Sequence, residues 1–389
     1  MESKLITIQS MTTTKTADTE ATIAQIKHLE AHGCDIVRVA VPDMESADAI
    51  AKIKENIIIP LVADIHFDHK LALRAVERGA DKIRINPGNI GGSAHSRNKN
   101  VKALADACNS RGIPIRIGVN SGSLEKSILA KHGGITADAM VESALGHVAL
   151  LNKYNFDNIW ISAKTSNVPL TVKTYRLLRE QTDYPLHIGI TEAGTEYAGI
   201  IKSAIGIGAL LLDGIGDTIR VSLTAEPERE VIAAKAILKA LGLRPGLDII
   251  SCPTCGRAGI DIINMAHETE QRLVSAGFAE QDLTVAVMGC AVNGPGEASH
   301  ADFGIAGLGA GQMVQGDGST VPPSAATQTA TTGTKNTQMV QGDGSTVTPP
   351  VPTVTPPVPL GIIFAKGKVI KKVPGDKLVD ELIEIIKKQ

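Results

Sequence analysis

The stretch PIRIGVN, residues 114 to 120, decides the fold, because it is an almost continuous apolar run with one charged residue, Arg116, and a polar end, Asn120. Runs of Val, Ile and Leu of this kind are typical of parallel strands that are covered on both faces. Seven similar runs occur before residue 225, with helix-like segments between them: KLITIQS, DIVRVAV, PLVADIHF, KIRINPG, NIWISAK, PLHIGIT and TIRVSL. Eight alternating strand and helix units predict a TIM barrel, an α/β fold.

The helical segments between the strands carry clear boundary signals. In DTEATIAQIKHLEAHG, either Asp18 or Thr19 can cap the helix, and a glycine closes it. Ile23, Ile26 and Leu29 then fall on one helical face, which is the spacing of a helix that packs on a core.

The pattern changes after residue 245, where proline and glycine in GLRPG break the last barrel helix. The strand LDIIS, the helix IDIINMAHETEQRLVSAG, the strand LTVAVMG, the hairpin GIIFAKGKVIKKV and the helix DKLVDELIEIIKK follow. We therefore predict a TIM-barrel domain at residues 1–245 and a smaller α+β domain at residues 246–389.

Residues 308–360 fit neither pattern. The string QMVQGDGSTV occurs at 312–321 and again at 338–347, and TVTPPVP stands twice in tandem between 346 and 359. Gly, Ser, Thr and Pro in this proportion cannot bury a core, so we expect a disordered or polyproline-like insertion. FGIAG before it and GIIF after it would then be neighbouring strands of a hairpin. A proline-rich ligand for a partner domain is the alternative.

The composition excludes several classes of function. Aromatic residues make up only 3% of the chain, which is few for a protein that stacks on nucleic-acid bases. The net charge of -2 gives no overall attraction for polyanions. No stretch reaches the roughly 18 apolar residues that cross a bilayer, and MESKLITIQSM does not read as a signal peptide. We expect a cytoplasmic enzyme that binds neither nucleic acid nor membrane.

Cationic side chains stand in or just after the barrel runs, and the active site of a TIM barrel lies at the carboxyl ends of its strands. The cations are Arg38, Arg84, Arg116, Lys164 and Arg220. Polar residues at the same ends are Asn120, Thr191, Glu192, Ser222 and His66. Any one of them could be a solvated or salt-bridged side chain, and Asp64, Glu192 and Asp217 would not balance the five cations fully. A small, aliphatic, phosphorylated ligand would balance the remaining positive charge.

The motif SCPTCGRAGI, residues 251–260, contains Cys252 and Cys255 between a strand and a helix, where a helix N-terminus stabilises thiolates. A third cysteine, Cys290, lies in MGCAVNGPGE, and the carboxylate of Glu297 follows seven residues later. Three thiolates in Gly/Pro loops with one carboxylate suit an iron–sulfur cluster with an unusual ligand.

A structural zinc site is the alternative for these cysteines, with His267 or His300 as the fourth ligand. Cys34 and Cys108 lie in ordinary helical or pre-strand context, and we interpret both as small buried side chains.

Taken in order, IQSMT, IVRVAV, RINPGN, RIGVNSGSL, SAKTS, GITEAGT and GIGDTIRVSL, followed by SCPTCGR and MGCAVNGPGE, resemble the bacterial 4-hydroxy-3-methylbut-2-enyl diphosphate synthases of the non-mevalonate isoprenoid pathway. The resemblance covers residues 1 to about 307 and 361–389. The chain differs from the family pattern in starting directly at the first strand, without the usual preceding hairpin, and in its inserted repeats.

The resemblance implies an oxidoreductase that opens the ring of 2-C-methyl-D-erythritol 2,4-cyclodiphosphate and removes a hydroxyl as water, with flavodoxin or ferredoxin as electron donor. It also implies a [4Fe-4S] cluster and a homodimer. The implied cluster ligands are Cys252, Cys255, Cys290 and Glu297. The implied substrate-binding residues are Arg38, Arg84, Arg116, Asn120, Lys164, Thr191, Arg220 and Ser222. Glu192 and Glu297 are the implied catalytic residues, Glu192 as the acid–base group. Without the resemblance, a zinc-stabilised, phosphate-binding barrel that is a lyase or a binding protein stays open.

Overall fold

A computed structural model describes residues 5–86, 90, 94–291, 294–308, 313–314, 320–321 and 360–388. The chain divides into two compact units, Met1–Arg244 and Pro245–Gln389, and each is described by itself.

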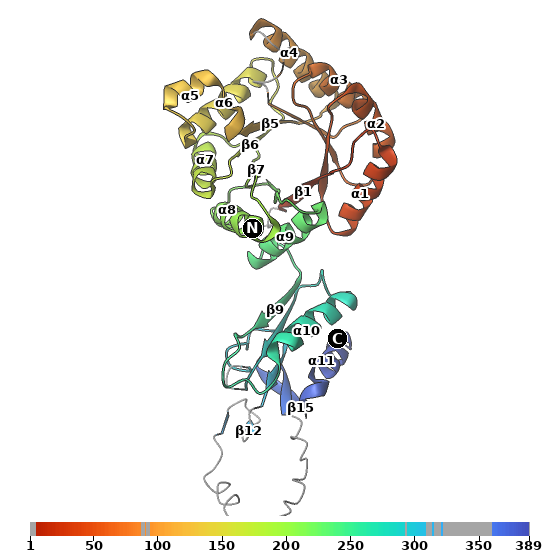
Figure 1. The fold of residues 1–389 in the computed structure, drawn as a ribbon, viewed down its shortest axis with the longest axis vertical. Coiled ribbons are helices and arrows are strands. Elements are labelled where there is room, and N and C mark those ends of the chain that lie inside the picture. The colour runs from red at the N-terminus through yellow and green to blue at the C-terminus, as the bar shows by residue number, and fades with distance from the viewer. Residues whose placement is uncertain are drawn as a thin grey trace, which may run out of the picture. The chain divides into compact units, whose positions relative to one another are not determined.

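The first unit is a barrel of eight parallel strands, which confirms the predicted fold (Figure 1). The strands pair in the order β6-β5-β4-β3-β2-β1-β8-β7, and a parallel bridge between Ile161 and Leu186 joins the two ends of the sheet. Their bounds are β1 (Thr7–Met11), β2 (Ile36–Ala40), β3 (Leu61–Asp64), β4 (Lys82–Ile85), β5 (Ile115–Asn120), β6 (Ile159–Lys164), β7 (His187–Ile188) and β8 (Thr218–Ile219).

Helices enclose the ring of strands, as Figure 1 shows. They are α1 (Thr19–Ala31), α2 (Met44–Lys54), α3 (His69–Glu77), α4 (Ala94–Arg111), α6 (Ala137–Asn152), α7 (Val168–Gln181), α8 (Glu196–Leu212) and α9 (Pro227–Ala240), with η1 (Ser121–Ser123) and the short α5 (Lys126–His132) after β5. The Asp18 side chain accepts a hydrogen bond from the Ala21 N–H, so Asp18 is the N-cap of α1. Ile26 and Leu29 of the predicted apolar face are fully buried.

The barrel core lies between the strands and the helices, and it is built from branched aliphatic residues such as Val37, Ile83 and Ile117. The alternate residues of the same strands include polar ones, because successive strand side chains point to opposite faces. On β4 and β5 these are Arg84 and Arg116, both buried. The alternation of side chains along each strand therefore places charged side chains inside the barrel, while the apolar side chains pack against the helices.

The second unit is an α+β domain with a mixed sheet in the order β15-β14-β11-β10-β9. Its elements are β9 (Leu247–Ser251), α10 (Ile262–Ser275), β10 (Leu283–Met288), β11 (Phe303–Gly307), β14 (Leu360–Ala365), β15 (Lys368–Pro374), η3 (Gly375–Lys377) and α11 (Leu378–Lys387). Strands β9, β10 and β11 are parallel, and β14 and β15 are antiparallel to their neighbours. Leu273, Val285 and Leu382 belong to the core of this unit.

The antiparallel pairing of β11 with β14 confirms that the segments on either side of the predicted insertion are neighbouring strands. Within the first repeat, β12 (Met313–Val314) pairs with β13 (Thr320–Val321). The prediction of a wholly irregular insertion is wrong at these four residues, where the β-branched Val314, Thr320 and Val321 favour an extended backbone. The rest of the insertion, including the second repeat, lies outside the described residues. Over the described part of the chain, no helix combines the length and the apolar character needed to span a bilayer.

Candidate active site

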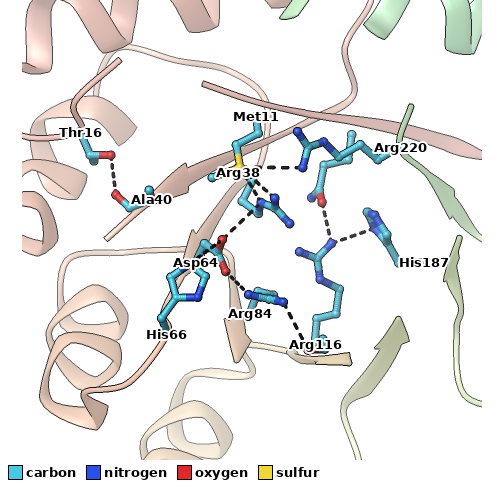
Figure 2. Close-up of polar contacts among 12 residues, drawn as sticks. Met11, Thr16, Arg38, Ala40, Asp64, His66, Arg84, Arg116, His187 and Arg220 are labelled. Carbon is cyan, nitrogen blue, oxygen red and sulfur yellow. Dashed lines mark hydrogen bonds and ion pairs between the residues drawn. The ribbon is translucent and has the colours of Figure 1, made fainter. Parts of the chain in front are cut away.

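The barrel strands bring their polar residues together in one pocket of about 140 Å³. All eight residues predicted to bind substrate line it: Arg38, Arg84, Arg116, Asn120, Lys164, Thr191, Arg220 and Ser222. Asp64, His66, Ser162 and His187 complete the lining. Figure 2 shows the central part of this arrangement, in which the guanidinium groups approach one another from different strands.

Asp64 is the carboxylate at the centre of one side of the pocket (Figure 2). Its Oδ1 accepts a hydrogen bond from Arg84 Nη1 at 2.9 Å, and its Oδ2 lies 3.7 Å from Arg38 Nε and 3.5 Å from His66 Nε2. Burial opposes ionisation of this carboxyl, but the charges of Arg38 and Arg84 outweigh it and lower its pKa to about 2. Asp64 is therefore a fixed negative charge that holds two arginines in place.

Arg38 and Arg220 meet at an uncharged acceptor, the thioether of Met11 (Figure 2). The sulfur accepts from Arg38 Nη2 at 2.8 Å and Nε at 3.1 Å, and it lies 3.9 Å from Arg220 Nη1. A thioether is a weak acceptor. A phosphate oxygen would bind the same donors much more strongly, because both partners of that hydrogen bond would be charged.

Arg116 crosses the barrel interior and is only 1% exposed. Its Nη1 donates to Gln9 Oε1 at 2.6 Å and to His187 Nδ1 at 2.9 Å. Since a guanidinium can only donate, His187 accepts at Nδ1 and carries its proton on Nε2. Burial, and then the charges of Lys164 and Arg116, lower the pKa of His187 well below its usual value, in agreement with this neutral tautomer.

The pocket has more buried positive charge than its carboxylates can balance. Burial, followed by the neighbouring arginines, lowers the pKa of both Arg116 and Lys164 well below the ordinary values. Within the described residues, Arg116 Nε and His187 Nε2 are buried without a hydrogen-bond partner. Unsatisfied donors and uncompensated cations in one cavity indicate an anionic ligand with several acceptor oxygens.

Two glycines make room for these side chains. A Cβ at Gly118 would lie 2.2 Å from Arg84 Nε, so only glycine lets Arg84 reach across β5. A Cβ at Gly189 would lie 2.3 Å from the Arg220 carbonyl oxygen and 2.9 Å from Lys164 Nζ. The glycines of RIGVN and HIGIT are thus part of the site and not only of the turns.

Glu192, the predicted acid–base residue, does not line the pocket. It directly follows Thr191, which does, and its own side chain is exposed. Its backbone lies in the left-handed region, with φ of 51°. A residue other than glycine adopts this conformation at a cost of about 1 to 3 kcal/mol, and such strain is concentrated at functional sites.

The sequence patterns did not identify His187, Ser162, Gln9 and Met11 as parts of the site. The signal that could have found them is the alternation along the strand. Gln9 and Met11 are two residues apart on β1, His187 is two residues before Gly189, and Ser162 is two residues before Lys164. Each therefore shares the inward face with a residue that belongs to the site.

The three clustered cysteines line one pocket of about 100 Å³ in the second unit, together with Pro253, Arg257, Ala258 and Gly289. The Gly289 N–H donates to Cys252 Sγ at 3.3 Å. The backbone N–H of Arg257 lowers the pKa of Cys255, whereas burial raises the pKa of Cys34 to about 11 and of Cys108 to about 12. The loop favours a thiolate, and the two buried barrel cysteines stay protonated, as interpreted from the sequence.

Glu297 is exposed and is not among the residues that line the cysteine pocket. His267 and His300, the candidate zinc ligands, do not line it either. In the part of the chain that the structure describes, no three Cys, His, Asp or Glu side chains lie in a geometry that could hold a metal ion. Two residues of the loop between Cys290 and Glu297, Val292 and Asn293, lie outside that part.

Comparison with known proteins gives concordant matches for both units. Residues 2–235 match the family described as the GcpE TIM-barrel domain, and residues 248–340 match the GcpE protein C-terminal domain. The chain is 52% identical over 384 residues to the 4-hydroxy-3-methylbut-2-en-1-yl diphosphate synthase (flavodoxin) of Caldanaerobacter subterraneus subsp. tengcongensis, covering 98% of this chain and 92% of that protein. It is 51% identical to the protein of the same name from Clostridium perfringens, covering 98% and 93%.

Among solved structures, the dihydropteroate synthase of Stenotrophomonas maltophilia is similar over 62% of this chain and 94% of its own, with 15% identity and a TM-score of 0.45.

Proposed function

This chain belongs to the GcpE family, and from that premise we propose how its residues perform the family's reaction. It is an oxidoreductase that forms 4-hydroxy-3-methylbut-2-enyl diphosphate by reductive ring opening of 2-C-methyl-D-erythritol 2,4-cyclodiphosphate. The reaction consumes two electrons and two protons and releases one water. Membership of this family of oxidoreductases decides against a lyase or a binding protein.

The observation that carries the proposal is the pocket in which five cations from different strands converge. A cyclic diphosphate supplies what this pocket lacks, namely several charged acceptor oxygens on a compact aliphatic body. Arg38, Arg116 and Arg220 grip the diphosphate, with Arg84 and Lys164 beside them. Asn120, Thr191 and Ser222 donate the uncharged hydrogen bonds that orient it. Each hydrogen bond between charged partners adds about 1.5 to 3 kcal/mol.

The cysteine pocket fits an iron–sulfur group by the chemistry of its donors. Three cysteine side chains, none of them in a disulfide, line one cavity, and backbone N–H groups face the sulfurs of Cys252 and Cys255. Cys252, Cys255 and Cys290 would hold a [4Fe-4S] cluster, and the group would supply the electrons of the reduction. The fourth ligand that we propose is Glu297, which follows Cys290 in the same loop.

We propose Glu192 as the group that delivers or removes a proton near the carbon centre. Support comes from its place in the chain, since Glu192 directly follows Thr191, which lines the pocket, and since its backbone has the strained left-handed conformation that is common at functional sites. Glu192→Gln should then lower kcat strongly and change KM little, because the uncharged amide cannot exchange a proton but has the same shape.

The relatives named above carry flavodoxin in their names, and we propose flavodoxin or ferredoxin as the electron donor of this chain. A homodimer and a cytoplasmic location stay predictions. Thiolate ligands require a reducing compartment, which supports the second.

The test of the proposed function is anaerobic purification followed by metal analysis and turnover. About four iron and four sulfide per chain, a brown colour, and consumption of the cyclodiphosphate with reduced flavodoxin would support it. A colourless protein with one zinc per chain would refute the cluster. Glu297→Ala tests the fourth ligand: an unchanged iron spectrum of the substrate-free protein would contradict the assignment.

A further inference from the structure

One buried carboxylate, Glu230, lies close to the arginines of the cation pocket. Glu230 lies on α9, outside the ring of strands, and is 5% exposed. It does not line the pocket, yet it reaches two neighbouring segments of the barrel. Its Oε1 accepts from the backbone N–H of Leu223 at 3.0 Å, and its Oε2 accepts from Ser10 Oγ at 3.1 Å.

The third partner of Glu230 is Arg220, a residue that does line the pocket. Arg220 Nε lies 3.4 Å from Glu230 Oε2, while its Nη1 lies 3.9 Å from the Met11 sulfur. The guanidinium is therefore held from behind at Nε by a carboxylate, and its far end faces a weak acceptor. The same carboxylate holds the N–H of the residue after Ser222, another member of the pocket.

Asp64 and Glu230 contact different arginines of the pocket. Asp64 binds Arg84 and Arg38, and Glu230 binds Arg220. A buried carboxylate is expensive unless hydrogen bonds and an opposite charge satisfy it, and Glu230 has all of these. Through its three partners, Glu230 fixes the end of β8 and the following loop, which carry Arg220 and Ser222.

We propose that Glu230 is a positioning residue for diphosphate binding, which orients Arg220 and the segment of Ser222 without touching the substrate. This inference rests on the proposed function, since it takes the pocket to be the diphosphate site.

Two other roles for Glu230 predict different results. If the carboxylate were only a counter-charge, removing its charge would raise the positive potential of the pocket and tighten the binding of an anion. If it were only a structural contact, its loss would lower stability and leave the affinity unchanged. A positioning residue predicts weaker binding although the pocket has become more positive.

The experiment measures the Kd of inorganic pyrophosphate for the full chain by calorimetry, at fixed salt, in wild type and in Glu230→Gln. Glutamine keeps the shape and the hydrogen bond from Leu223 N–H but loses the charge that holds Arg220. We expect Kd to rise about tenfold, as for the loss of one hydrogen bond between charged groups. An unchanged or lower Kd overturns the inference.

Four further variants separate this result from its alternatives. Glu228→Gln, on the same helix and 4.0 Å from His28, is the matched control and should bind pyrophosphate as wild type does. Glu230→Asp keeps the charge but shortens the reach, so it should also weaken binding, and it replaces the glutamine variant if that one does not fold. In an Arg220→Met background, Glu230→Gln should have no further effect on Kd, because the positioned group is gone.

The controls also distinguish the inference from the proposed function. If the wild-type chain binds no pyrophosphate, the pocket is not a diphosphate site and both fail. If the wild type binds pyrophosphate, and Glu230→Gln and Glu230→Asp bind it with the same Kd as the wild type, only the proposed role of Glu230 is wrong. An additive double variant with Arg220→Met would also contradict it.

Discussion

Asp64→Asn should destabilise the barrel, because it removes the carboxylate that holds Arg84 at 2.9 Å and Arg38 at 3.7 Å. The pKa of Asp64 falls from an ordinary 3.8 to about 2 in the folded protein. That fall corresponds to about 2 kcal/mol of stability at neutral pH. The variant also leaves two buried guanidinium groups without a charged partner, which brings the expected loss to about 3 to 5 kcal/mol.

The pH dependence of this effect has a definite sign. A carboxyl whose pKa is lowered on folding contributes its full stability above the unfolded value of 3.8. The contribution is lost as the pH falls from there towards 2. The difference in stability between wild type and Asp64→Asn should therefore be constant from pH 7 to pH 5 and shrink below pH 4.

Urea unfolding followed by tryptophan fluorescence measures this difference, because the single tryptophan, Trp160, lies on β6 of the barrel. Asp48→Asn is the matched control: Asp48 binds Arg74 and Arg78, but its side chain is 42% exposed, so this substitution should lower the free energy of unfolding much less than Asp64→Asn does. Pyrophosphate should restore part of the stability of Asp64→Asn. A loss below about 1 kcal/mol for Asp64→Asn would refute the reading of Asp64 as the anchor of the cation cluster.

Three further predictions concern the thiols, the buried lysine and the insertion. Cys255→Ser should lose most of its iron on anaerobic purification, whereas Cys34→Ser, at a buried barrel thiol, should keep it; equal iron contents would contradict the cluster assignment. A bound diphosphate should raise the lowered pKa of Lys164, so the protein should take up protons when it binds diphosphate at alkaline pH. Calorimetry in buffers of different ionisation enthalpy measures this proton uptake, and Lys164→Met should reduce it. Equal proton uptake by wild type and Lys164→Met would exclude Lys164 as the group that is protonated. Replacing residues 309–359 by a short turn should leave iron content and turnover unchanged, because the Leu308 N–H already donates to the Leu360 carbonyl oxygen at 2.8 Å. A loss of turnover with full iron content would show that the insertion has a role.

The fold could be predicted because its signals are local and repeated. Most barrel strands are short runs rich in Val, Ile and Leu, and parallel strands that are covered on both faces are typically composed in this way. The cations could be predicted as a group for the same reason, since Arg38, Arg84 and Arg116 interrupt runs that are otherwise apolar. In a TIM barrel the outer face of each strand is covered by apolar helix surfaces, so a charged residue near the carboxyl end of a strand is expected to point into the barrel.

Partners that depend on contacts between distant segments could not be predicted. Gln9 and Arg116 are 107 positions apart, and Met11 and Arg220 are 209 apart. Glu230 looks like an ordinary charge in the first turn of a helix that begins with PERE, and only the packing of α9 against β1 and the end of β8 turns it inward. For Glu297 the sequence and the structure differ in the other direction. Its spacing from Cys290 suggested a cluster ligand, whereas its side chain is exposed in the structure.

The choice of acceptors inside the pocket has a consequence for binding. Arg38 is bound by a thioether, and Arg116 by an amide oxygen and an imidazole nitrogen. These neutral groups hold the arginines in ordered positions but compete weakly with a phosphate oxygen. A carboxylate in each of their places would stabilise the empty barrel and would have to be displaced from every arginine by the substrate. With one carboxylate on a side of the pocket, at Asp64, and another behind Arg220, at Glu230, the pocket is ordered before binding and still leaves positive charge for the diphosphate.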